Sequence, residues 1–106
     1  MIIVKSQNDL VVVCPKDIMY CLADGSYTHI YLKDNRKLLV SKALNHIQDQ
    51  LSEKFFVRLH RSHLVNLTFV KSFANHTTNV VKMENGEELK VSMDRRKELL
   101  KHFIII

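Results

Sequence analysis

The stretch that decides the fold reads Phe55-Phe56-Val57-Arg58-Leu59-His60-Arg61-Ser62-His63-Leu64-Val65-Asn66. Its two ends are apolar, whereas its middle, residues 60–63, is polar. Apolar runs on either side of a short polar segment predict strands separated by a loop. If residues 56–59 form a strand, alternation places Arg58 on the face opposite Val57 and Leu59. The loop is then suited to presenting hydrogen-bond donors.

The sequence before this stretch shows short strand patterns and one helical pattern. Apolar or alternating runs, separated by turn residues such as Asp24-Gly25-Ser26, predict strands. The pattern then changes to helical spacing, which predicts a helix over residues 41–51 with Ser41 as its N-cap. The predicted strands are residues 2–5, 10–14, 17–22, 28–32 and 38–40.

Strand patterns continue after the first helix, and a second helix closes the chain. Asn85-Gly86 predicts a type I′ hairpin, because both central residues of that turn need positive φ. Residues 93–103 predict a helix capped by Ser92. The fold class is therefore mostly β, with packed antiparallel sheets and two short helices. The later strands are predicted at residues 55–59, 65–73 (with an interruption), 79–83 and 89–92.

Length and composition favour one compact domain over residues 1–106. The chain is 46% hydrophobic, enough to build a core, and it contains no linker-like tract. No apolar run approaches the roughly 20 residues that a membrane helix needs, so no membrane partner is expected. Cys14 and Cys21 lack the paired spacing of a zinc site, and unpaired thiols suit a reducing cytoplasm.

Positive charge gathers in two places. The net charge is +5, and residues 54–71 contain no acidic side chain. A second basic cluster, Arg95-Arg96-Lys97, lies in the first turn of the last predicted helix, where backbone N–H groups are free to meet phosphate. Each cluster is either a solvated surface or a nucleic-acid contact. Arginine can bind two acceptors of guanine, and the first helix offers few long polar side chains, so loops are the expected readers.

Catalytic and metal sites are not expected. His60 and His63 are three residues apart, so on one strand they would point to opposite faces and could not share an ion without a turn. Ser62 lies outside any nucleophile-elbow motif, and the chain has no phosphate loop or paired carboxylates. The sequence therefore predicts no enzyme activity, no cofactor, no metal and no small-molecule substrate.

Three blocks in order resemble the LytTR family of bacterial DNA-binding domains, over about residues 2–103. They are residues 55–66, Ala23-Asp24-Gly25-Ser26-Tyr27-Thr28, and residues 84–92. The resemblance implies an elongated stack of antiparallel sheets with short helices, serving as the output domain of a response regulator. It also implies loops inserted into successive major grooves of double-stranded DNA, bending of the site, and tandem copies, possible homodimers, on imperfect direct repeats.

The resemblance also implies roles for individual residues. Arg61 is the leading base contact, Arg58 and Ser62 are phosphate or support contacts, and Asp94 stands where the family commonly has arginine. That departure keeps an alternative open, a protein-interaction module on the same scaffold that has lost specific DNA reading. Lys42 is either a phosphate contact or a solvated side chain. The predicted DNA-binding residues are Ser26, Lys42, Arg58, Arg61, Ser62, Ser92, Arg95, Arg96 and Lys97.

Overall fold

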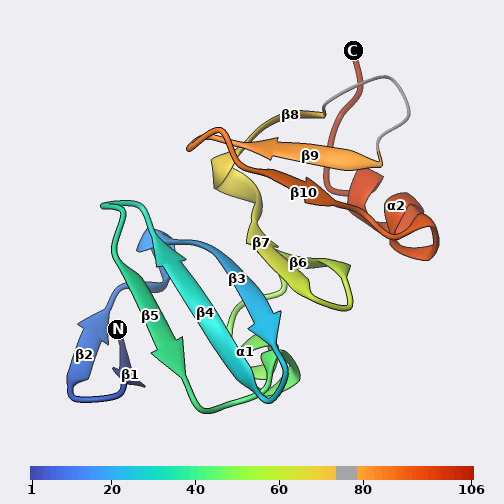
Figure 1. Ribbon diagram of the computed structural model, residues 1–106. Helices are drawn as coiled ribbons and strands as arrows, with labels where there is room; N and C mark the ends of the chain where they lie inside the picture. Colours follow the sequence, from blue (N-terminus) through green and yellow to red (C-terminus); the bar gives the residue numbers. More distant parts are fainter. Residues whose placement is uncertain (74–78) are drawn as a thin grey trace.

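A computed structural model describes residues 1–73 and 79–106 and confirms the mostly-β prediction (Figure 1). The described part holds ten strands, two α-helices and two short 3₁₀ turns, Pro15–Asp17 and Leu67–Phe69. The helices are α1 (Leu44–Gln50) and α2 (Met93–Leu100). The strands are β1 (Ile2–Lys5), β2 (Leu10–Val13), β3 (Ile18–Asp24), β4 (Tyr27–Leu32), β5 (Lys37–Val40), β6 (Phe56–His60), β7 (His63–Asn66), β8 (Val70–Phe73), β9 (Val80–Met83) and β10 (Glu88–Lys90).

The strands form three antiparallel sheets. The central one has five strands in the order β5-β4-β3-β7-β6, the second is the hairpin β1-β2, and the third has the order β10-β9-β8. Figure 1 shows the third sheet and α2 at one end of the molecule and the first hairpin at the other. The molecule is elongated, with extents of 44 × 25 × 22 Å.

Two hydrophobic cores cover the two faces of the five-stranded sheet. Alternation along β7 sends Leu64 to one core and Val65 to the other, and both side chains are fully buried. The first core contains residues of β1, β2 and α1, including Val4 and Leu44. The second contains residues of β9, β10 and α2, including Leu99. The β6–β7 hairpin therefore lies between two packed layers.

Asn66 ends β7 with a buried side chain that bonds the backbone. Its Nδ2 donates to the Ile18 carbonyl at 3.0 Å, and its Oδ1 accepts from the backbone N–H of Thr68 at 3.0 Å. The second bond caps the 3₁₀ turn that interrupts the predicted strand 65–73. Asn66 therefore has a structural role, because it bonds the backbone where β7 ends.

The start of the first helix differs from the prediction. The helix begins at Leu44, its N-cap is Ala43, and Ser41 lies before it as an exposed residue. The backbone of Lys42 is instead held by the Thr28 hydroxyl, which donates to the Lys42 carbonyl at 2.7 Å. This bond ties the segment before the helix to β4, so a tertiary contact, rather than the N-cap preference of serine, sets where the helix begins. Ser92 does occupy the N-cap of α2, but its side chain makes no capping bond.

The Asn85-Gly86 turn is not the type I′ turn that the sequence predicts. Only Gly86 has positive φ, at 90°, and the loop between Met83 and Glu87 contains three residues. Three-residue hairpin loops place a single left-handed residue, usually glycine, after a type I turn. The side-chain Nδ2 of Asn85 donates to the Tyr20 hydroxyl at 2.9 Å, and this bond joins the turn to the central sheet.

Candidate nucleic-acid interface

The turn between β6 and β7 presents Arg61 to solvent. Arg61 is exposed, whereas Ser62 beside it is half-buried. His60 pairs with His63 across the hairpin, and the backbone N–H of Ser62 donates to His60 Nδ1 at 3.1 Å. The turn is therefore held from within, and its arginine projects outward from a fixed backbone.

Arg58 lies on β6, shortly before this turn, and its guanidinium holds the turn in place. Nε donates to the His60 carbonyl at 2.9 Å, and one terminal nitrogen donates to the Arg61 carbonyl. The other terminal nitrogen donates to Asn45 Oδ1 at 2.8 Å and to Gln48 Oε1 at 2.7 Å. Of its two predicted roles, this geometry favours support, because the fork of the guanidinium joins the turn to α1.

Asn45 and Gln48 of α1 have a supporting role that the sequence analysis missed. They are three residues apart on α1, a spacing that places two side chains on one helix face. That spacing, together with an arginine on the outer face of a nearby strand, is the signal that could have found them. Burial lowers the pKa of the Arg58 guanidinium, and the neighbouring charge of Arg95 lowers it further.

The two histidines lie on either side of a turn rather than on one strand, so the argument from opposite strand faces does not apply to them. A hairpin turn separates them, and their rings stack with centroids 4.7 Å apart. Burial lowers the pKa of His60, and the charges of His63 and Arg61 add to this effect. Among residues 1–73 and 79–106, no three potential metal ligands of the His, Cys, Asp or Glu type gather in one place.

A second turn lies directly beside the first. The backbone N–H of Ala23 donates to the Ser62 carbonyl at 2.9 Å, which joins β3 to the β6–β7 turn. Two residues connect β3 to β4, and Gly25 takes a φ of 60° there, a conformation that glycine adopts without strain. Ser26, the other turn residue, is exposed. The structure thus brings the predicted contacts Ser26 and Arg61 onto neighbouring turns.

The segment that leads into α2 joins the other side of the β6–β7 hairpin. The backbone N–H of Ser92 donates to the Leu59 carbonyl at 2.7 Å, and the His63 ring is 3.0 Å from the Lys90 carbonyl. Leu99 anchors α2 in the second core, where it is fully buried. The cationic first turn of the helix is thereby fixed next to the Arg61 turn.

The side chains of that helical turn differ in exposure. Arg95 and Arg96 are half-buried, whereas Lys97 and the acidic Asp94 are exposed. The charge of Arg95 contributes to lowering the Arg58 pKa, so positive charge from α2 acts on the guanidinium that holds the β6–β7 turn. Positive charge from two segments far apart in sequence is therefore concentrated at one place.

Lys42 reaches the same end of the central sheet by a different route. It is exposed, and its backbone is bound to Thr28, which follows the β3–β4 turn by one residue of β4. The nine predicted residues thus lie on the β3–β4 turn, the end of β5, the β6–β7 hairpin and the start of α2. These segments are linked by the hydrogen bonds described above.

Comparison with known proteins identifies the family. The sequence model of the protein family described as LytTr DNA-binding domain matches residues 8–104 of this chain. The chain belongs to the LytTR family. Among its relatives, the sensory transduction protein LytT of Bacillus subtilis is 33% identical over 97 residues, which cover 89% of this chain and 39% of that protein. The transcriptional regulatory protein NatR of the same organism is 28% identical and covers 92% of this chain and 42% of that protein.

This LytTR domain also shares its fold with a solved member. The LytTr DNA-binding domain of a putative response regulator from Bacillus cereus superposes with a TM-score of 0.81, at 23% identity, over 95% of this chain and 94% of that one. The LytTR chain spans less than half the length of the curated relatives named above. None of its described helices is long and apolar enough to cross a membrane.

Proposed function

We propose that this chain binds double-stranded DNA in a sequence-specific way, as the DNA-reading part of a bacterial transcription regulator in the cytoplasm. The observation that carries the proposal is the pairing of Arg58 and Arg61. One arginine uses its donors to hold the turn, and the other is exposed on that turn. An exposed guanidinium on a turn whose backbone is held in this way can bind O6 and N7 of guanine in the major groove.

Phosphate contacts come from the neighbouring segments. The side chain of Ser92 leaves the first N–H groups of α2 uncapped, and such groups suit an anion. Ser26 is exposed on the turn beside that of Arg61, and Lys97 is exposed on α2. Ser62 and Lys42 complete this group of donors. The long axis of 44 Å exceeds one turn of B-DNA, about 34 Å, so one molecule has the length to reach successive major grooves.

Tandem binding follows from the same shape. The whole of residues 1–106 acts as one unit in this proposal, and two such units, placed head to tail as a homodimer on DNA, read imperfect direct repeats. A head-to-tail arrangement keeps the same orientation in both copies, as a direct repeat requires. Because one copy is longer than a single turn of DNA, a half-site spacing of two helical turns, about 20–21 base pairs, keeps both copies on one side of the duplex without overlap.

Asp94 favours a second candidate function. It is exposed in the cationic first turn of α2, where it would repel phosphate, although aspartate can accept from the N4 amino group of cytosine. If this turn avoids DNA, the scaffold serves instead as a protein-interaction module. The two candidates differ in whether the chain prefers one DNA sequence over another.

Selection of bound duplexes from a random pool separates them. We expect enrichment of one short motif, repeated in direct orientation, and an affinity that falls steeply with salt as counterions are released. Arg61→Ala should cost about 1–3 kcal/mol of discrimination at one base pair. Lys71→Ala, on β8 of the third sheet, is the matched control and should keep the motif. A flat enrichment profile would support the protein-interaction module.

A further inference from the structure

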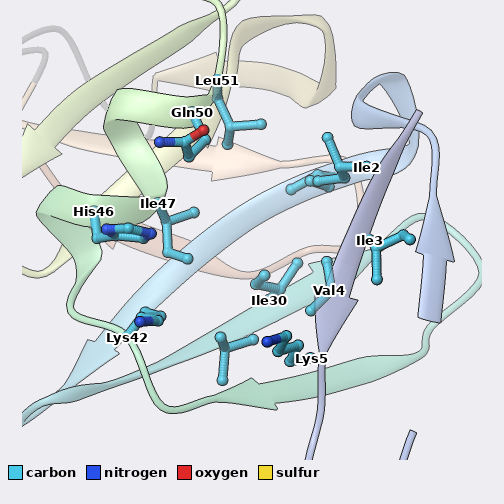
Figure 2. A pocket seen from close by; sticks show the side chains of 12 residues that line it. Ile2, Ile3, Val4, Lys5, Ile30, Lys42, His46, Ile47, Gln50 and Leu51 are labelled. Atoms are coloured by element: carbon cyan, nitrogen blue, oxygen red, sulfur yellow. The ribbon is translucent and has the colours of Figure 1, made fainter. Parts of the chain in front are cut away.

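A cavity unrelated to the proposed base-reading turn lies between β1, α1 and the central sheet (Figure 2). Its volume is about 410 Å³, within the range of about 300–1,000 Å³ that is typical of small-molecule sites. Its polar lining consists of Lys5, Lys42, His46 and Gln50. The apolar lining residues are Ile2, Ile3, Val4, Ile18, Ile30, Val40, Ile47 and Leu51.

The apolar walls belong to the first core. Val4 and Ile30 are almost completely buried, and Ile47 packs against this core from α1. In Figure 2 the side chain of Ile47 points from the helix toward β1, across the space that Ile30 and Val4 border from below. An alkyl chain in this space would be removed from water on several sides, which favours its binding.

The polar lining is cationic. Lys5 and Lys42 lie at the same end of the cavity in Figure 2, opposite the end formed by Ile2 and Leu51. None of the lining residues that the structure describes is acidic. Within residues 1–73 and 79–106, no hydrogen bond or ion pair engages the side chains of Lys5, Lys42 or His46. Two ammonium groups are thus available to an anion at one end of an apolar space.

We propose that this cavity binds an amphipathic organic anion, a medium-chain alkyl carboxylate, as an effector. The alkyl chain lies between Ile47 and Val4, and the carboxylate accepts hydrogen bonds from Lys5 and Lys42. A carboxylate suits this end better than a hydroxyl because hydrogen bonds between two charged groups are stronger than neutral ones. The binding claim stands independently of the proposed DNA function.

The regulatory part of the inference rests on the proposed function, because Lys42 belongs to both sites. A carboxylate on Lys42 neutralises a charge that would otherwise face phosphate, so the anion should weaken DNA binding. Linkage requires the reverse effect as well, with DNA weakening the binding of the anion by the same factor.

Binding can be measured directly by titrating the ¹⁵N-labelled chain with hexanoate, heptanoate and octanoate below their micelle concentrations. We expect saturable amide shifts on β1 and α1, with affinity rising about fourfold for each added methylene. Octanol is the matched probe for the charge, and it should bind at least tenfold more weakly than octanoate. Equal binding of octanol and octanoate, or shifts spread over the whole surface, would overturn the proposal.

Variants locate the site. Ile47→Trp fills the cavity and should reduce octanoate affinity at least tenfold, and Lys5→Gln should reduce octanoate affinity while leaving octanol unchanged. Lys71→Gln, far away on β8, is the control and should bind normally. If Ile47→Trp fails to fold, Ile47→Phe provides the same test. Shifts on β1 and α1 that grow with protein concentration alone would assign the cavity to an apolar segment of a second copy and overturn the proposal.

DNA binding provides a separate readout. Octanoate should lower the affinity of the chain for its selected duplex, and Lys5→Gln, which lies outside the proposed DNA contacts, should shift this effect to higher octanoate concentrations. Saturable binding of octanoate with unchanged DNA affinity would refute the regulatory part alone. Absence of sequence preference with intact octanoate binding would instead refute the proposed function, so the two failures are distinguishable.

Discussion

The base and the tip of the β6–β7 hairpin contain the same residue type in opposite situations. At the base, Arg58 makes four hydrogen bonds to the turn and to α1. At the tip, Arg61 is exposed and contributes its carbonyl, rather than its side chain, to that arrangement. The difference teaches that a basic cluster in a sequence can combine residues whose side chains hold the local structure with residues whose side chains are free to contact a partner. Substitutions along the hairpin should separate these two roles.

The largest loss of stability is expected from a substitution on the face of β6 that packs into the second core. Leu59 is completely buried in the second core. Leu59→Ala should lower the free energy of unfolding by about 2–5 kcal/mol, because it removes apolar contacts and leaves a cavity. Urea denaturation measures this loss. Leu10→Ala, on an exposed position of β2, is the control, and a comparable loss there would contradict the assignment of the core.

Arg58 should come next. Arg58→Met keeps the length of the side chain but removes every donor, and we expect a loss of about 1.5–3 kcal/mol, the value of a charged hydrogen bond. DNA affinity should fall as well, because the turn loses its support. Arg58→Lys tests geometry against charge, since an ammonium cannot reproduce the planar fork. Full retention of stability and DNA binding in Arg58→Lys would show that only the charge matters.

Arg61 should affect folding least among these three positions. Arg61→Ala removes an exposed side chain, so the free energy of unfolding should change by no more than about 0.5 kcal/mol. Thermal and urea unfolding both test this. A loss as large as that of Arg58→Met would place Arg61 among the supporting residues and would remove the contrast between tip and base.

The smallest effect is a dependence on pH through His60. Its folded pKa is lowered, chiefly by burial, whereas the unfolded chain has the ordinary value of about 6.5. Below that pH the unfolded state binds a proton that the folded state resists. Stability from His60 is therefore complete above pH 7 and declines as the pH falls through about 6.5. Protonation would also remove the acceptor that Ser62 uses.

Comparison with His60→Gln isolates this contribution from the other histidines. Above about pH 7, the free energies of unfolding of the wild type and the variant should differ by a constant amount. At lower pH, the free energy of unfolding of the wild type should fall relative to that of the variant. The opposite slope, with the wild type gaining stability as the pH falls, would mean that the folded chain favours the charged ring.

Much of the fold could be predicted from local pattern, and the failures have a common cause. Alternation and turn residues locate most strands, because half-buried strands must alternate. The type I′ turn at Asn85-Gly86 and the N-cap at Ser41 were wrong because bonds from distant residues, to Tyr20 and from Thr28, decide the local conformation. The hydrogen bonds from Arg58 to Gln48 and Asn45 of α1 were missed for the same reason, since they join residues that are 10 and 13 positions apart in the sequence.

The central sheet separates two cores while belonging to both. Neighbouring residues of β7 enter opposite layers, and Leu64 and Val65 are each inaccessible to water. Neither layer can come apart without wetting one side of the same five strands. The first hairpin and the last helix, at opposite ends of the chain, therefore stabilise the same sheet from its two sides.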